Sequence, residues 1–137
     1  MTYLDEMAPG MKAETAKTIT EADILMFAAV STDTNPVHID AEAAAKSMFG
    51  QRIAHGMLSA GLISAVLGTK LPGPGSIYLG QTLRFRAPVT IGATVCARVE
   101  VTAVDTAKKR VTLKTECFVG DTLVIDGEAV VIPPSRT

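Results

Sequence analysis

The feature that most constrains the fold is a change in hydrophobic period near residue 70. Before it, "HGMLSAGLISAVLG" (residues 55–68) is apolar on nearly every side of a helix, which predicts a buried helix rather than an amphipathic one. Pro72 and Pro74 end this helix, because proline lacks the backbone donor that a helix needs. After them, apolar and polar residues alternate, which is the pattern of strands.

The second half of the chain predicts a run of antiparallel strands. In "SIYLGQTLRFRAPV", we expect Ile77, Leu79, Leu83 and Phe85 to share one face of a strand. The alternation continues in "ATVCARVEVTAV", "KRVTLKTECFV" and "TLVIDGEAVVI", and the breaks between them have hairpin character. A further strand is expected near "KAETAKTIT".

The first half predicts helices with recognisable starts. Thr20 to Asp23 form a plausible capping box before "EADILMFAAV". Asp40 can cap a short helix through "AEAAAKSMF". Together these elements predict one α+β domain over residues 1–137, an antiparallel sheet wrapped around the buried helix. Such a sheet leaves strand edges open, so we expect a homodimer.

Charge and hydropathy exclude several classes of function. The chain has 13 basic and 14 acidic residues, mixed along its length, so no basic block predicts nucleic-acid binding. The longest apolar stretch, residues 53–68, is too short and too interrupted to span a membrane. Residues 1–12 carry two acidic groups and no apolar run, unlike a signal peptide. We therefore expect a cytoplasmic enzyme or binding module.

The two cysteines, Cys96 and Cys117, have opposite parity relative to the apolar positions of their strands. In one sheet they would lie on opposite faces, so we expect two free thiols and no disulfide. Their spacing does not match a metal-binding motif either.

Polar side chains gather in "STDTNPVHID", residues 31–40. Pro36 stops the preceding helix, so the stretch is expected to be a loop that aims Asp33 and His38 at a common point. A carboxylate beside an imidazole can hold and activate water. Asn35 is expected to tie the loop to nearby backbone, as Asx turns do. The alternative is a well-made turn with a half-buried histidine.

A second group stands in "AHGMLSAGL", at the start of the buried helix. Gly56 permits close approach to the backbone, and the first N–H groups of a helix have no partners within it. They could stabilise a carbonyl oxygen that gains negative charge. For His55, helix-end capping and packing stand beside a supporting or substrate-binding role.

Residues 31–68 resemble the hydratase motif of the MaoC-like (R)-specific enoyl-CoA hydratases, and "LPGPGSIYLGQTLRFRAPVTIGATV" resembles the strands that follow it in short bacterial members. The resemblance extends from about residue 11 to 132. It implies a hot-dog fold, a homodimer, and reversible hydration of trans-2-enoyl-CoA to (R)-3-hydroxyacyl-CoA. It implies no metal and no cofactor.

Carried over residue by residue, the resemblance gives Asp33 and His38 the role of holding and activating water. It makes Gly56 the glycine whose N–H receives the thioester oxygen, and Ser64 a serine near the pocket. The family often has glycine before the aspartate, where this chain has Thr32. That departure bears on the geometry of the loop.

Three other functions remain open. A dehydratase acting on acyl-carrier-protein thioesters, or on a branched or dicarboxylic acyl-CoA, would use the same chemistry. Arg84 and Arg86, on one strand face, could belong to a basic docking patch for an acidic carrier protein. A non-catalytic thioester-binding module and a thioesterase are the remaining alternatives. Acyl chain length and pathway are not fixed by the sequence, although the resemblance suggests supply of monomers for polyhydroxyalkanoate.

Overall fold

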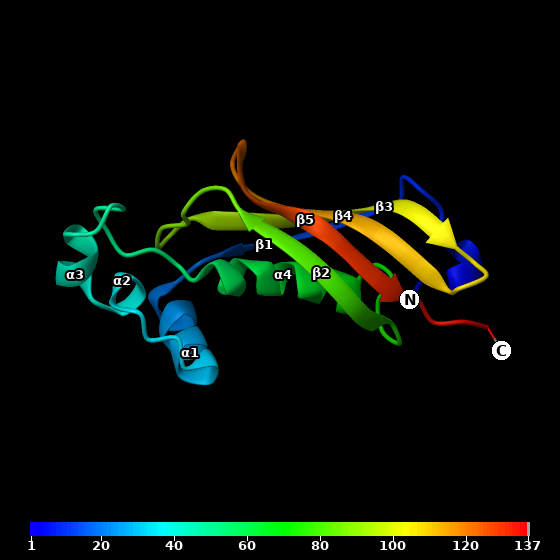
Figure 1. Ribbon diagram of the computed structural model, residues 1–137, viewed down its shortest axis with the longest axis horizontal. Helices are drawn as coiled ribbons and strands as arrows, with labels where there is room; N and C mark the ends of the chain where they lie inside the picture. Colours follow the sequence, from blue (N-terminus) through cyan, green and yellow to red (C-terminus); the bar gives the residue numbers. More distant parts are fainter. Residues whose placement is uncertain (137) are drawn as a thin grey trace.

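The structure, a computed structural model, describes residues 1–136. Five antiparallel strands form one sheet in the order β1-β3-β4-β5-β2, and the helix α4 runs along one face of it (Figure 1). After a 3₁₀ turn at Leu4–Glu6, the elements are β1 (Lys12–Thr18), α1 (Glu21–Ser31), α2 (Pro36–Ile39), α3 (Ala41–Ala45), α4 (Gly56–Thr69), β2 (Ile77–Phe85), β3 (Thr94–Asp105), β4 (Arg110–Val119) and β5 (Thr122–Ile132). The predicted α+β architecture is confirmed.

The core lies between the sheet and α4, and the alternation of the central strands creates it. From Val95 to Val101 in β3 and from Val111 to Cys117 in β4, every second side chain is buried, and the side chains between them face outward. The buried set contains Val95, Ala97, Val99, Val101, Val111, Leu113 and Cys117 from these strands, with Ile63, Val66 and Leu67 from α4. The alternation of apolar and polar residues in the sequence therefore identifies the face of the sheet that holds the core.

The helix α4 is buried on one side only. Ser59, Ile63, Val66 and Leu67 are buried, whereas Met57 is 55% exposed. The positions on the open side, Gly61, Ser64 and Gly68, are also exposed. The prediction of a helix buried on every side is thus wrong for the single chain. The physical reason is that α4 packs on β1, β3 and β4, and one sheet covers only one side of a helix.

The strand β2 departs from the predicted alternation. Its register against β5 shifts between Tyr78 and Gly80, so Leu79 forms a bulge. Leu83 and Phe85 pair with β5 positions on the helix-facing side, whereas Ile77 pairs with Ile132 on the other side. The prediction that Ile77 shares a face with Leu83 and Phe85 is wrong, because the bulge reverses the alternation between them.

The cysteines lie on opposite faces, as predicted. Cys117 pairs with Ala97 on the buried face, and Cys96 pairs with Phe118 on the outer face. Both are free thiols. Burial, with a smaller contribution from the charge of Cys96, raises the pKa of the Cys117 thiol to about 12.

The three short helices α1, α2 and α3 gather at one end of the sheet, next to the start of α4 (Figure 1). Two of the predicted caps are present. Thr20 accepts a hydrogen bond from the Asp23 N–H in a capping box, and Asp40 accepts from the Glu42 and Ala43 N–H groups. None of the helices in residues 1–136 is long and apolar enough to cross a bilayer.

Candidate active site

The loop that carries Asp33 begins at a strained residue. Thr32 ends α1 in the left-handed conformation, with φ 64° and ψ 10°. A β-branched residue rarely adopts it, whereas glycine adopts it without penalty. The turn is braced locally, because the Ser31 hydroxyl donates to the Phe27 carbonyl at 2.6 Å and accepts from the Asp33 N–H at 3.1 Å. Thr32 therefore stands at a position whose backbone conformation favours glycine.

Asn35 shapes the next part of the loop through the Asx turn that the sequence predicts. Its side-chain oxygen accepts from the Val37 N–H at 3.2 Å and caps α2. The Asn35 N–H donates to Asp33 Oδ1 at 3.2 Å. Pro36 occupies the first position of α2, where its missing N–H costs nothing. Asn35 thus orients the loop and one oxygen of the Asp33 carboxylate.

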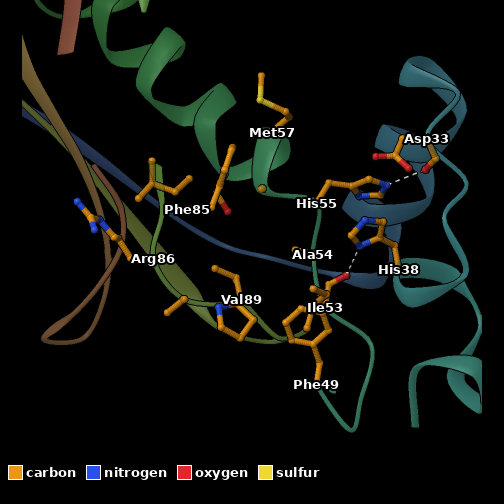
Figure 2. Close-up of a pocket in the computed structure, with 15 residues that line it drawn as sticks. Asp33, His38, Phe49, Ile53, Ala54, His55, Met57, Phe85, Arg86 and Val89 are labelled. Carbon is orange, nitrogen blue, oxygen red and sulfur yellow. Dashed lines mark hydrogen bonds between the residues drawn. The ribbon is translucent and has the colours of Figure 1, made fainter. Parts of the chain in front are cut away.

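His38 lies in α2 with its side chain buried. Its Nδ1 lies 2.8 Å from the Ile53 carbonyl oxygen (Figure 2). A carbonyl can only accept, so Nδ1 carries the proton of the neutral ring. The other nitrogen, Nε2, then holds a lone pair that can accept a proton, as a general base must.

His55 precedes α4 and is almost fully buried, with 2% of its surface exposed. Its side chain does not cap the helix, so the capping expectation is wrong. Instead, Nε2 donates to the Asp33 carbonyl oxygen at 2.8 Å, and the ring stacks on that of His38 with 3.9 Å between centroids (Figure 2). The two histidines therefore form one cluster with Asp33.

Gly56 is the first residue of α4. Its N–H belongs to the first turn, whose N–H groups have no acceptor within the helix and lie at the positive end of the helix dipole. The ring of Phe85 covers the place where a Cβ at position 56 would lie. A residue with a Cβ therefore fits at position 56 only if the ring of Phe85 moves.

These residues line one cavity of about 410 Å³. Asp33, His38 and His55 lie together on one side of it (Figure 2), Gly56 also lines it, and its walls are mostly apolar. The remaining wall residues are Phe49, Ile53, Ala54, Met57, Ser59, Phe85, Arg86, Ala87, Pro88, Val89 and Ile125. As predicted, Asp33 and His38 line a common cavity, which the first residue of α4 also lines, but His38 lies in the helix α2 rather than in a loop.

Ser64 is the predicted site residue that the structure does not place there. It is exposed on the open side of α4 and is absent from the cavity wall. Eight residues separate it from Gly56, which is about 12 Å along a helix. Ser59, one turn from Gly56, lines the cavity instead, and its buried Oγ has no hydrogen-bond partner among the described residues.

Asp33, His38 and His55 also offer side-chain ligand atoms that all lie within 4.8 Å of one another, a distance compatible with a metal ion. The two imidazole planes, however, are only 27° from parallel. Stacked rings direct their lone pairs along nearly parallel planes rather than toward one ion. The arrangement fits water activation better than metal binding.

The predicted basic patch is largely neutralised. Arg86 forms two hydrogen bonds with the Asp126 carboxylate, at 3.0 and 3.1 Å. The neighbouring hollow contains Arg84 and Lys114, but also Glu116 and Asp126. With Arg86 included, the hollow has three basic and two acidic side chains, and an excess of one positive charge gives little support for docking of an acidic carrier protein.

Comparison with known proteins agrees with this geometry. Residues 5–125 match the family model described as "MaoC like domain". The chain is 54% identical to an (R)-specific enoyl-CoA hydratase from Rhodospirillum rubrum over 98% of this chain and 93% of the relative. It is 47% identical to a 3-hydroxybutyryl-CoA dehydratase from Methylorubrum extorquens, over 98% and 85% of the two chains.

The fold matches a solved structure closely. A structure titled as the (R)-hydratase from A. caviae involved in PHA biosynthesis superimposes with a TM-score of 0.90 and 48% identity. The match covers 93% of this chain and 98% of that one. The five-stranded sheet and its helix are therefore the hot-dog fold of such hydratases.

Proposed function

We propose that this chain, which belongs to the MaoC-like domain family, is an (R)-specific enoyl-CoA hydratase. One observation carries the proposal: the carboxylate of Asp33, the imidazole of His38 and the first residue of α4 face the same apolar cavity. Addition of water to an unsaturated thioester needs these parts. It needs a proton acceptor for water, a donor for the carbonyl oxygen, and a dry space for the acyl group.

The reaction follows from the positions of these groups. The thioester carbonyl accepts a hydrogen bond from the Gly56 N–H, which draws electron density from C3 of the enoyl group. Water held between Asp33 and His38 forms the new C3–O bond as one of its O–H bonds breaks. The electrons of the double bond move toward the carbonyl, and the resulting enolate is stabilised at the start of α4.

A proton then returns to C2 on the face from which water attacked, so that addition is syn. The Asp33–His38 pair takes one proton from water and supplies one to C2, which leaves the enzyme unchanged. The reverse sequence removes water from the (R)-3-hydroxyacyl thioester. No other reactant is required.

The first prediction concerns the thioester carrier. We expect hydration of crotonyl-CoA to proceed with a higher kcat/KM than hydration of the same acyl group on acyl-carrier protein, because the hollow beside the cavity has an excess of only one positive charge. Measuring the loss of enoyl absorbance with both substrates tests this. A strong preference for the carrier protein would instead favour the dehydratase alternative. No turnover with either would contradict the hydratase proposal.

The assembly that we propose is a homodimer joined along the β2 edge. Within residues 1–136, the outer edge of β2 has no strand beside it. Apolar side chains are exposed on this strand, and Phe85 is 55% exposed although it faces the helix side of the sheet. The open side of α4 is exposed as well. A second copy could cover both surfaces.

The second prediction tests this interface. Light scattering should give a dimer mass at micromolar concentration, and Leu79→Lys should shift the protein toward monomer, because it buries a charge at the joined edge. Met48→Lys is the matched control, since Met48 is 91% exposed on a loop distant from β2 in the sequence. A fully active monomer at that concentration would contradict the proposal.

Two wider features also belong to the proposal. Reaction in the cytoplasm is supported by the two free cysteines. Supply of (R)-3-hydroxyacyl-CoA for polyhydroxyalkanoate is supported by the likeness to a hydratase whose title names that process.

A further inference from the structure

Two segments that are distant in the sequence meet at the cavity. A histidine from each segment forms a hydrogen bond with the main chain of the other segment. His38 donates to the Ile53 carbonyl, in the segment that leads to α4, at 2.8 Å. His55 donates from that segment to the Asp33 carbonyl, in the loop that precedes α2, also at 2.8 Å. Each ring thus holds the main chain of the other segment (Figure 2).

The other hydrogen bonds between these two segments hold His38 in place but do not involve Asp33. The Ile53 N–H donates to the Val37 carbonyl at 3.2 Å, and Arg52 Nε donates to the His38 carbonyl at 2.7 Å. These bonds tie the short helix α2 to the segment before α4. None of them reaches the residue that carries the carboxylate.

Asp33 has few other restraints. Its remaining hydrogen bonds within residues 1–136 are local, from its N–H to Ser31 Oγ and from the Asn35 N–H to its carboxylate. It is exposed, and it follows the left-handed Thr32. Among the described residues, the hydrogen bond from His55 is the only one that joins Asp33 to a part of the chain outside its own loop.

We propose that His55 is a positioning residue that sets the distance between the proton acceptor Asp33 and the oxyanion donor Gly56. His55 and Gly56 are consecutive, so the residue that precedes the oxyanion donor also holds the main chain of the acceptor. This inference rests on the proposed hydratase function. Placement matters because misplacing reacting groups by about 1 Å can cost about 100-fold in rate.

A purely structural role for His55 would depend on a different property of its ring. Its ring packs against Phe27, with 4.8 Å between centroids, and stacks on His38. Its Nδ1 is buried and has no hydrogen-bond partner among the described residues. If packing alone mattered, an apolar ring would serve equally well. If positioning matters, the donor at Nε2 is the essential part.

Two variants separate these roles. His55→Phe keeps a ring but removes the donor, whereas His55→Gln removes the ring but places an amide N–H near the position of Nε2. We expect His55→Phe to lower kcat by about 10- to 100-fold with KM within about threefold, because the fault lies in placement. His55→Gln should retain activity within about threefold of wild type, a smaller loss than misplacement causes.

A third comparison asks whether the effect passes through Asp33. In an Asp33→Asn background, adding His55→Phe should lower kcat by less than about threefold, because the group that His55 positions is already disabled. An undiminished loss in that background would overturn the proposal. So would an active His55→Phe beside a folded but inactive His55→Gln. If His55→Phe does not fold, the activity of His55→Gln decides the matter alone.

A measurement without substrate keeps this inference separate from the proposed function. Amide hydrogen exchange of residues 33–35 should be faster in His55→Phe than in wild type and near wild type in His55→Gln. Unchanged exchange in His55→Phe would overturn the positioning role even if the hydratase is active. Conversely, a wild-type protein without hydratase activity would refute the proposed function, while the exchange data would still report on the His55–Asp33 bond.

Discussion

Asp33→Asn is expected to lower kcat for hydration by about 10²- to 10⁴-fold, the usual effect of losing a positioned acid or base. The amide has nearly the size of the carboxylate, and Asp33 is exposed, so the fold should lose little packing. The amide cannot take a proton from water, and its NH₂ presents donors where an acceptor is needed. Hydration rate and melting temperature should be measured on the same samples.

His38→Gln should cost a similar order in kcat, because the Nε2 lone pair is lost. In the double variant with Asp33→Asn, the loss should fall well short of the product of the two single losses, since both groups act on one water. A structural loop predicts the reverse: lower melting temperatures and modest kinetic changes. An Asp33→Asn protein that keeps more than about a tenth of wild-type turnover would contradict the catalytic role.

Gly56→Val should reduce turnover by about 10²- to 10³-fold, the effect of removing an oxyanion donor. The new side chain would displace the ring of Phe85 and crowd the place of the thioester carbonyl. Turnover should therefore fall much further than a loss of folded protein, judged from the melting temperature, would explain.

A double variant separates the two kinds of crowding. Replacing Phe85 with alanine frees space for the valine. The Gly56→Val/Phe85→Ala protein should therefore be little less stable than the Phe85→Ala protein. The Phe85→Ala replacement should not restore turnover, because the valine still crowds the substrate. Recovery of turnover on removal of the Phe85 ring, or near-normal turnover of a folded Gly56→Val, would refute the oxyanion role.

The fold could be predicted where local pattern and tertiary structure agree. The alternation in β3 and β4 identifies the buried face because both strands lie in the middle of the sheet. The alternation in β2 misleads at Leu79, because a bulge leaves no clear signal in one sequence. The open side of α4 was missed for another reason. Small and apolar residues look alike whether a sheet or a second copy covers them.

The candidate site was predictable to the extent that its chemistry is local. Asp33, Asn35 and His38 stand within six residues around a proline, so one loop brings them together. The bond from His55 to Asp33 spans 22 positions, and no periodicity predicts it. Ser59 and Phe85 reach the cavity only through the packing of α4 against the sheet. Ser64 stands about 12 Å beyond Gly56 along α4, and this cavity does not extend that far along the helix.

Chiral analysis of the product from crotonyl-CoA tests the central claim most directly, because the face of C3 that water attacks depends on where Asp33, His38 and Gly56 stand around the cavity. The wild-type protein should give (R)-3-hydroxybutyryl-CoA alone, and the Asp33→Asn/His38→Gln protein should give almost none. An (S) or racemic product, or an (R) product that persists when both residues are replaced, would contradict this account of the site.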